Sequence, residues 1–198
     1  RDPSRIEGRQ WKDNVEVFVG DLLNFDSLAA ALKDIDVAYY LVHSMYGGKD
    51  YAEKDRQAAN NFVNAGQHLK KVIYLGGLLP NTEKVSTHLK SRSEVGEILR
   101  RGLPTLEFRA GPIIGSGSAS FEMVRYLTER LPVMVAPKWI HHQVQPIAVK
   151  DVMRYLVLAL DKQYKGVLDI GADVLTFKQM MDGYAKVRGL TRTIITVP

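Results

Sequence analysis

Short apolar runs alternate with longer amphipathic segments along most of the chain, and this alternation limits the fold more than any other sequence feature. Each apolar run has the length of a buried strand. Each intervening segment has apolar residues at the spacing of one helix face. Strands joined by helices form parallel sheets that are covered on both faces. The sequence therefore predicts an α/β fold with a Rossmann-like, doubly wound parallel sheet.

The expected parallel strands lie near residues 15–20, 37–42, 72–76 and 105–110, and a further short strand near 166–172. We expect helices at 25–35, 50–69, 91–102, 118–131, 150–162 and 176–190. Asp26 is a possible cap of the first helix, and Gly189 a stop for the last. No linker is evident, so residues 1–198 are interpreted as one domain, with a less regular substrate-side lobe from about residue 115.

Composition narrows the function classes. The chain of 198 residues has no cysteine, which excludes disulfides, thiolate catalysis and cysteine-bound zinc and fits a reducing cytoplasm. Its net charge of +5 comes from basic residues scattered among acidic ones, which favours a solvated surface over a nucleic-acid interface. A basic cleft for phosphorylated ligands is the alternative that this charge still allows. The apolar runs are too short for a membrane span, and no signal peptide is evident. We expect a cytoplasmic protein with a small-molecule substrate, and a homo-oligomer is possible.

Small or polar residues stand where the four main strands should end. Parallel sheets bind ligands outside these carboxyl ends. One such end would mean little, because loops need glycine anyway, but four together predict a ligand site. They are Gly20-Asp21-Leu22, Val42-His43-Ser44, Gly76-Gly77 and Gly111-Pro112.

The stretch "GDLLNFDSLAAALKDIDVAYYLVHS" resembles the region after the second βα unit of NAD(P)-binding short-chain dehydrogenase/reductases. The match is closest to their atypical branch, the NmrA-like proteins and nucleoside-diphosphate-sugar epimerases. "KVIYLGGL", "EFRAGPIIGSGSASFEMVRYL", "QPIAVKDVMRYLVLAL" and "LDIGADVLTFKQMM" follow in that family's order. The resemblance covers nearly the whole chain, although no single motif is highly specific.

The family opens with a strand and a Gly-x-x-Gly-x-x-Gly turn, and neither occurs in this sequence. The start "RDPSR" resembles the segment just after the family's second strand. The resemblance therefore implies an N-terminally truncated Rossmann domain. We expect the 198-residue span alone to bind NAD or NADP weakly or not at all.

The resemblance places Arg1, and more weakly Arg5, where this branch often holds the 2′-phosphate of NADP. A guanidinium suits that dianion, so NADP is favoured over NAD. The alternative is a charged chain start without a role.

The resemblance also implies further cofactor contacts. Asp21 would accept a hydrogen bond from the adenine amino group, and the Leu22 backbone N–H would serve an adenine ring nitrogen. His43 and Ser44 would lie beside the ribose of the nicotinamide half. Asp21 as a turn residue and His43 as a solvated loop residue are the alternatives. The strand end at Gly111-Pro112 is assigned to the same cofactor site.

The family's catalytic Tyr-x-x-x-Lys pattern aligns with His88 and Arg92. Arg92 could hold ribose hydroxyls with its permanent charge, and His88 could donate a proton near neutral pH. Gly76 and Gly77 replace the serine or threonine of many active relatives and offer only close backbone approach. His88 and Arg92 are therefore either a catalytic and cofactor-binding pair or an inert helix start. The absence of a serine or threonine hydroxyl at positions 76 and 77 favours the inert helix start.

His141 and His142 are adjacent, so in an extended segment they point to opposite faces. No further ligands stand at metal-binding spacing, and we predict no metal site. Trp139 and Gln145 are expected to line the substrate side of the cleft.

Two functions remain open. The first is an NAD(P)-dependent oxidoreductase or epimerase in its full-length form. The second is a non-catalytic module that binds NADP(H) and reports redox state.

Overall fold

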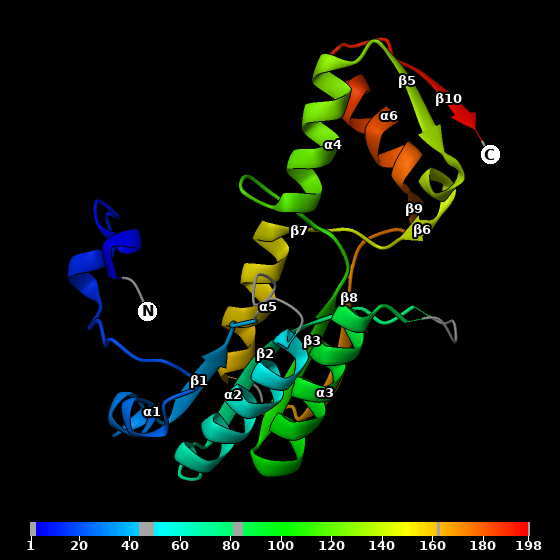
Figure 1. Ribbon diagram of the computed structural model, residues 1–198. Coiled ribbons are helices and arrows are strands. Elements are labelled where there is room, and N and C mark those ends of the chain that lie inside the picture. The colour runs from blue at the N-terminus through cyan, green and yellow to red at the C-terminus, as the bar shows by residue number, and fades with distance from the viewer. Residues whose placement is uncertain (1–2, 44–49, 81–84, 162, 198) are drawn as a thin grey trace. The chain divides into compact units, whose positions relative to one another are not determined.

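The computed structural model describes residues 3–43, 50–80, 85–161 and 163–197 (Figure 1). The chain forms two compact units. Unit 1 is Arg1–Phe108 with Gln163–Leu168, and unit 2 is Arg109–Lys162 with Asp169–Pro198. Each unit has an apolar core of its own. The interpretation as one domain with a lobe from about residue 115 stays a prediction.

The main sheet has four strands in the order β1-β2-β3-β8. The strands are β1 (Val37–Tyr40), β2 (Lys71–Gly77), β3 (Thr105–Ala110) and β8 (Gly166–Ile170). β1 and β2 run parallel, in a register that extends from Val37 opposite Lys71 to Tyr40 opposite Tyr74. The α/β fold with a parallel sheet, predicted from the alternation, is confirmed.

Unit 1 holds three α-helices: α1 (Phe25–Leu32), α2 (Tyr51–Ala65) and α3 (Thr87–Gly102). Two 3-10 turns, Pro3–Ile6 and Lys12–Asn14, precede them. α2 and α3 lie side by side in Figure 1 and pack together over one face of the sheet. Their apolar stripes and the strands share one core, which includes Tyr40, Ala59, Phe62, Val72, Tyr74, Val95 and Leu99.

The predicted strand at 15–20 is wrong. These residues belong to no strand in the structure. Their apolar side chains are exposed, with Val19 at 70%. A strand needs a neighbour that pairs its backbone groups, and the described residues bring none to this segment. The chain joins the core only at Leu22, whose carbonyl accepts a hydrogen bond from Asn61 Nδ2 at 3.0 Å.

The cap of α1 also differs from the expectation. Asn24, not Asp26, is the N-cap residue, and its Oδ1 accepts a hydrogen bond from the Ser27 backbone N–H at 3.1 Å. Asp26 lies inside the first turn, where a carboxylate is favourable to the helix dipole.

Unit 2 contains three longer helices and several short strands. The helices are α4 (Ala119–Arg130), α5 (Val149–Asp161) and α6 (Phe177–Val187), with a 3-10 turn at Lys138–His141. The strands are β4 (Ile113–Ile114), β5 (Val133–Pro137), β6 (Gln143–Val144), β7 (Ile147–Ala148), β9 (Leu175–Thr176) and β10 (Thr193–Val197). In the described part of the chain, no helix combines the length and the apolar character needed to cross a bilayer.

Three strand pairs and a methionine-rich core organise unit 2. β10 runs parallel to β5, β4 runs parallel to β7, and β6 runs antiparallel to β9. Val124 of α4 packs with Met180 and Met181 of α6 and with Met134 of β5. α4 and α6 are therefore held together through their apolar faces.

Both ends of α6 are fixed by local contacts. At its start, Thr176 Oγ1 accepts a hydrogen bond from the Gln179 backbone N–H at 3.1 Å. Gln179 Oε1 in turn accepts one from the Thr176 backbone N–H at 2.7 Å. At its end, Gly189 has a φ of 65°, and the Leu190 N–H donates to the Ala185 carbonyl at 2.8 Å. The prediction that Gly189 stops this helix is confirmed.

Candidate functional site

The candidate site lies in unit 1, where β1 and β2 end. Parallel strands bring their carboxyl ends to one edge of the sheet, so the residues after β1 and those at the end of β2 are neighbours. His43 comes from the first end and Gly76-Gly77 from the second. The first turns of α3 add His88 and Arg92. The sequence predicted these residues for one site, and their roles stay predictions.

His43 and His88 face each other. Their ring centroids are 6.2 Å apart, with the rings inclined at 64°. The pKa of each histidine is lowered from its ordinary value, first by burial and then by the positive charge of Arg92. Asp55 opposes this shift in both. A helix-start residue without a role would point its ring to solvent, whereas His88 is half-buried against His43.

Arg92 reaches the end of β2 from one turn further along α3. Its Nη2 donates to the Leu75 carbonyl at 2.6 Å, and a Cβ on Gly77 would lie 3.6 Å from its Nε. The Nε atom is buried and has no hydrogen-bond partner among the described residues. A buried N–H without a partner costs about 1–3 kcal/mol. Arg92 therefore has a donor that a ligand could use.

Behind these residues lies a buried polar pair that sequence reasoning missed. Ser91 Oγ donates to Asp55 Oδ2 at 3.0 Å, which joins α3 to α2, and both side chains are buried. The signal was available in the sequence. Asp55 lies three and four residues before Ala58 and Ala59, so it occupies the apolar face of its helix. Asp55 is the nearby carboxylate that partly offsets the charge of Arg92 at the two histidines.

A second missed residue explains why glycine occupies position 76. The Glu107 side chain in β3 is only 1% exposed and forms an ion pair with Arg100 of α3. A Cβ on Gly76 would lie 2.9 Å from Glu107 Oε1, and one on Gly96 would lie 2.7 Å from Glu107 Cδ. The carboxylate thus fills the space that a serine or threonine at 76 would need. The glutamate within the apolar run "TLEFRA" was the sequence signal.

Gly77 is restricted from the helix side. A Cβ there would lie 2.8 Å from Leu89 Cδ2. Side chains at both 76 and 77 would therefore require their neighbours to move. The end of β2 offers backbone alone, as predicted for these two glycines.

Asp21 takes part in its own turn. Its Oδ1 accepts from the Leu23 N–H at 3.0 Å, and its backbone N–H donates to Ser27 Oγ at 3.0 Å. These contacts are those of a turn residue, the alternative to an adenine contact. The adenine roles of Asp21 and Leu22 stay predictions. Arg1 and Ser44 lie outside the described residues.

The remaining predicted site residues belong to unit 2. Gly111 packs against Gln145, where a Cβ would lie 3.0 Å from the Gln145 carbonyl carbon, and the Pro112 carbonyl accepts from the Ile147 N–H at 3.0 Å. Gln145 Nε2 donates to the Ala172 carbonyl at 3.0 Å. These contacts hold Gly111 and Pro112 in a packed turn. Their assignment to the cofactor site stays a prediction.

The 3-10 turn Lys138–His141 of unit 2, with the residue that follows it, contains Trp139 and the two adjacent histidines. The Trp139 ring stacks edge-on against Phe177 at 5.6 Å, and His141 Nε2 lies 3.0 Å from Thr196 Oγ1. In the described residues no group of three or more histidine, aspartate or glutamate side chains is placed to hold a metal. The substrate role of Trp139 and Gln145 stays a prediction.

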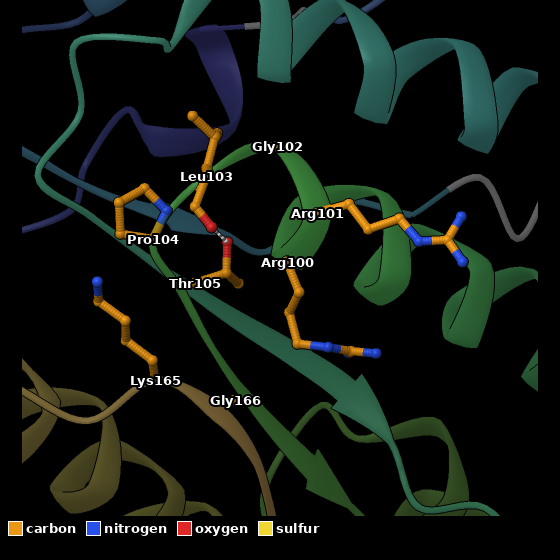
Figure 2. A pocket seen from close by; sticks show the side chains of 8 residues that line it. All are labelled: Arg100, Arg101, Gly102, Leu103, Pro104, Thr105, Lys165 and Gly166. Atoms are coloured by element: carbon orange, nitrogen blue, oxygen red, sulfur yellow. Dashed lines mark hydrogen bonds between the residues drawn. The ribbon is translucent and has the colours of Figure 1, made fainter.

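A cavity of about 360 Å³ lies elsewhere in unit 1, at the amino-terminal ends of β3 and β8. Figure 2 shows Arg100, Arg101 and Lys165 around it. Arg100 pairs with Glu107, and Arg101 pairs with Glu97 at 2.5 Å. Because it lies at the opposite ends of the strands, this cavity is separate from the His43–Arg92 cluster.

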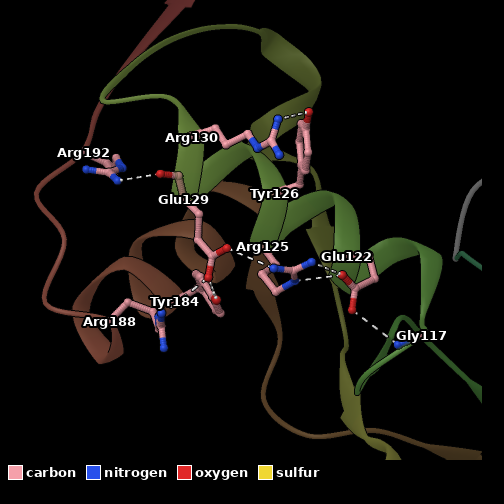
Figure 3. Close-up of polar contacts among 9 residues, drawn as sticks. All are labelled: Gly117, Glu122, Arg125, Tyr126, Glu129, Arg130, Tyr184, Arg188 and Arg192. Atoms are coloured by element: carbon pink, nitrogen blue, oxygen red, sulfur yellow. Dashed lines mark hydrogen bonds and ion pairs between the residues drawn. The ribbon is translucent and has the colours of Figure 1, made fainter.

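A polar network joins α4 to α6 in unit 2 (Figure 3). Tyr184 donates to Glu129 Oε1 at 2.6 Å, and Arg125 pairs with the other oxygen at 3.0 Å. Arg192 donates from Nη2 to the Glu129 carbonyl at 3.1 Å. This network is a structural link between the helices and the chain before β10.

No protein-family model and no curated protein sequence matches the chain. Solved structures do match it. UDP-glucose 4-epimerase of Thermotoga maritima has a TM-score of 0.75 at 14% identity, covering 94% of this chain and 74% of its own. UDP-N-acetylglucosamine 4-epimerase of Bacillus cereus has a TM-score of 0.71 at 15% identity, covering 96% and 76%. The protein RMD of Pseudomonas aeruginosa, solved with NADPH, has a TM-score of 0.71 at 12% identity, covering 90% and 75%. The chain therefore has the Rossmann-type α/β fold of these nucleotide-sugar epimerases and of RMD.

Proposed function

We propose that the chain is the nicotinamide-nucleotide-binding part of an oxidoreductase or epimerase of the short-chain dehydrogenase/reductase type. The observation that carries the proposal is the convergence of His43, Arg92 and the glycine end of β2 at one edge of the parallel sheet. Ligands bind at this edge in open α/β sheets. The epimerases of similar fold include one solved with NAD, and RMD was solved with NADPH, which supports the same cofactor class here.

The residues present fit such a ligand. The unpartnered Nε of Arg92 can donate to a ribose hydroxyl, and glycines at 76 and 77 let a flat ring approach the backbone. A bound nicotinamide would supply or accept a hydride. His88 would then exchange a proton with the substrate oxygen, donating it when the substrate is reduced and accepting it when the substrate is oxidised. Burial and the charge of Arg92 lower the pKa of His88, which favours the accepting form.

A second function is favoured by one specific observation. Glu107 fills the space beside Gly76, so the hydroxyl that many active relatives carry has no room. This favours a non-catalytic module that binds NADP(H) and reports redox state. Turnover distinguishes the two functions, because both require nucleotide binding.

Binding and turnover of the full protein test the proposal. We expect Arg92→Ala to weaken NADPH binding by about tenfold or more, since a hydrogen bond to a charged donor contributes about 1.5–3 kcal/mol. Arg101→Ala is the matched control on the same helix, because Arg101 is exposed and pairs only with Glu97 in the contacts described. The measurement is calorimetry with NADPH and NADH. Equal affinities for the wild type and both variants would refute the site.

His88→Ala separates the enzyme from the sensor. Loss of reductase turnover with unchanged NADPH binding would identify the histidine as the proton donor. If the wild type turns over no carbonyl substrate in a broad panel yet binds NADPH, the sensor is the better description.

A further inference from the structure

Three basic side chains gather at the site, and they come from two different elements. His43 follows β1, while His88 and Arg92 stand one turn apart on α3. The histidine rings contact each other, and Arg92 is close enough to both for its charge to act on each. The group is thus a pair of facing histidine rings with a permanent cation one helical turn from His88.

Within the described residues, one carboxylate acts on both histidines of the cluster. Asp55 on α2 is the carboxylate whose charge acts on both histidines, and it is buried and receives a hydrogen bond from Ser91. One carboxylate faces one permanent cation and two groups that can each gain a proton. Once either histidine is protonated, the cluster carries net positive charge.

The chemistry of these groups excludes most ligands. A metal ion would be repelled by Arg92, and only two of the three side chains could ligate it. A neutral sugar hydroxyl would satisfy the free Nε of Arg92 but would gain nothing from two protonatable rings. An oxyanion can accept from both rings while the charge of Arg92 attracts it, and charge-assisted hydrogen bonds are the stronger ones.

We propose that His43, His88 and Arg92 form a subsite for an oxyanion group of the substrate, a carboxylate or a phosphate. The inference rests on the proposed function, because that function makes the ligand a substrate. It adds that this substrate carries a carboxylate or a phosphate. The anion accepts hydrogen bonds from the histidine rings and is attracted by the positive charge of Arg92, whose single unpartnered Nε–H stays with the ribose hydroxyl of the proposed cofactor.

Proton uptake accompanies binding. The free histidines have pKa values lowered by burial, by Arg92 and, for His43, by His88, and Asp55 is the described residue that acts in the opposite direction. A bound anion stabilises the protonated rings. This counteracts the lowering by burial and by the charge of Arg92, so the anion raises both pKa values. Affinity for the anion therefore rises as the pH falls toward the pKa of the free rings, by up to about tenfold per pH unit for each proton taken up.

The test is an NMR pH titration of the histidine rings in the full protein, in acetate, in inorganic phosphate and in chloride at equal ionic strength. We expect acetate or phosphate to raise the pKa of both His43 and His88, with chloride as the baseline. His142, an exposed histidine of unit 2, is the internal control and should not respond. A response to acetate alone assigns a carboxylate, and a response to phosphate alone assigns a phosphate.

Equal pKa values of the two rings in acetate, phosphate and chloride would overturn the proposal, because only general screening of Arg92 would then be acting. The wild-type titration needs no variant that could misfold. Arg92→Lys, which keeps the charge, should retain the response in weaker form, whereas Arg92→Gln should remove most of it. The titration is run without nucleotide and then with NADPH. An anion response without any NADPH binding would refute the proposed cofactor function and leave the oxyanion subsite standing.

Discussion

Gly96→Ala is the sharpest test of how Glu107 shapes the site. Alanine in a helix interior is normally more stable than glycine by about 1 kcal/mol. Gly96 lies inside α3, but its missing Cβ faces the buried carboxylate of Glu107. The same carboxylate occupies the space beside Gly76, so the variant examines the reason that the end of β2 lacks a side chain.

The magnitude follows from the distances. A Cβ on Gly96 would lie 2.7 Å from Glu107 Cδ and 2.8 Å from Oε1, closer than real contacts allow. Glu107 is ion-paired with Arg100 and has no route to solvent, so it cannot retract freely. Overpacking of this kind costs about 1–3 kcal/mol. After subtraction of the helix-propensity gain of about 1 kcal/mol, Gly96→Ala should be neutral to about 2 kcal/mol destabilising.

The assay is urea unfolding followed by far-UV circular dichroism, with Gly183→Ala as control. Gly183 lies inside α6 and a Cβ there would meet nothing within 4 Å, so this variant should gain about 1 kcal/mol. Gly96→Ala should also stabilise a background in which Arg100→Met and Glu107→Ala remove the ion pair together. If Gly96→Ala stabilises the wild-type protein as Gly183→Ala does, Glu107 does not fill this space and the explanation for Gly76 fails.

Three further outcomes are expected. Thr176→Ala should cost about 1 kcal/mol in unfolding free energy, because it removes the side-chain half of the α6 capping box with Gln179; an unchanged urea midpoint would contradict this. The hydrogen bond from Tyr184 lowers the pKa of Glu129, with the charge of Arg125 acting in the same direction. The stabilisation from ionised Glu129 is therefore complete above the pKa of an unfolded glutamate and is lost as the pH falls through the lowered pKa of the folded state. Tyr184→Phe should make the acid-unfolding curve of unit 2 less steep, and identical curves would argue against the link. Arg1→Glu in the full protein should reverse a preference for NADPH over NADH, and calorimetry showing equal ratios for wild type and variant would remove the 2′-phosphate role of Arg1.

The sequence by itself determined the order of β1, β2, β3 and β8, the order of the six α-helices and the end of α6 at Gly189. It did not determine the short strands of unit 2, and the strand predicted at 15–20 is wrong. Gly189 acts through hydrogen bonds within five residues, so local spacing was enough to predict it; the Thr176 cap depends equally on local spacing but was not predicted. The parallel pairing of β1 with β2 also followed, because a helix of the length of α2 between two apolar runs leaves few other connections. The prediction that Arg92 lies near the end of β2 came from the family resemblance, which aligns Arg92 with the lysine of the Tyr-x-x-x-Lys pattern.

Tertiary structure decided what depends on partners distant in sequence. Residues 15–20 have strand propensity but no paired neighbour in the described chain, and propensity cannot supply the missing hydrogen bonds. The burial of Glu107 depends on Arg100 and on the absence of side chains at Gly76 and Gly96. Sequence spacing places Gly96 and Arg100 on one face of α3, but it does not bring Glu107 or Gly76 to them. The facing of His43 and His88 likewise arises only when β1 and α3 are brought to one edge of the sheet. Polar groups in a protein interior are stabilised by whichever partner the fold brings within hydrogen-bonding reach, and that partner is set by packing in three dimensions.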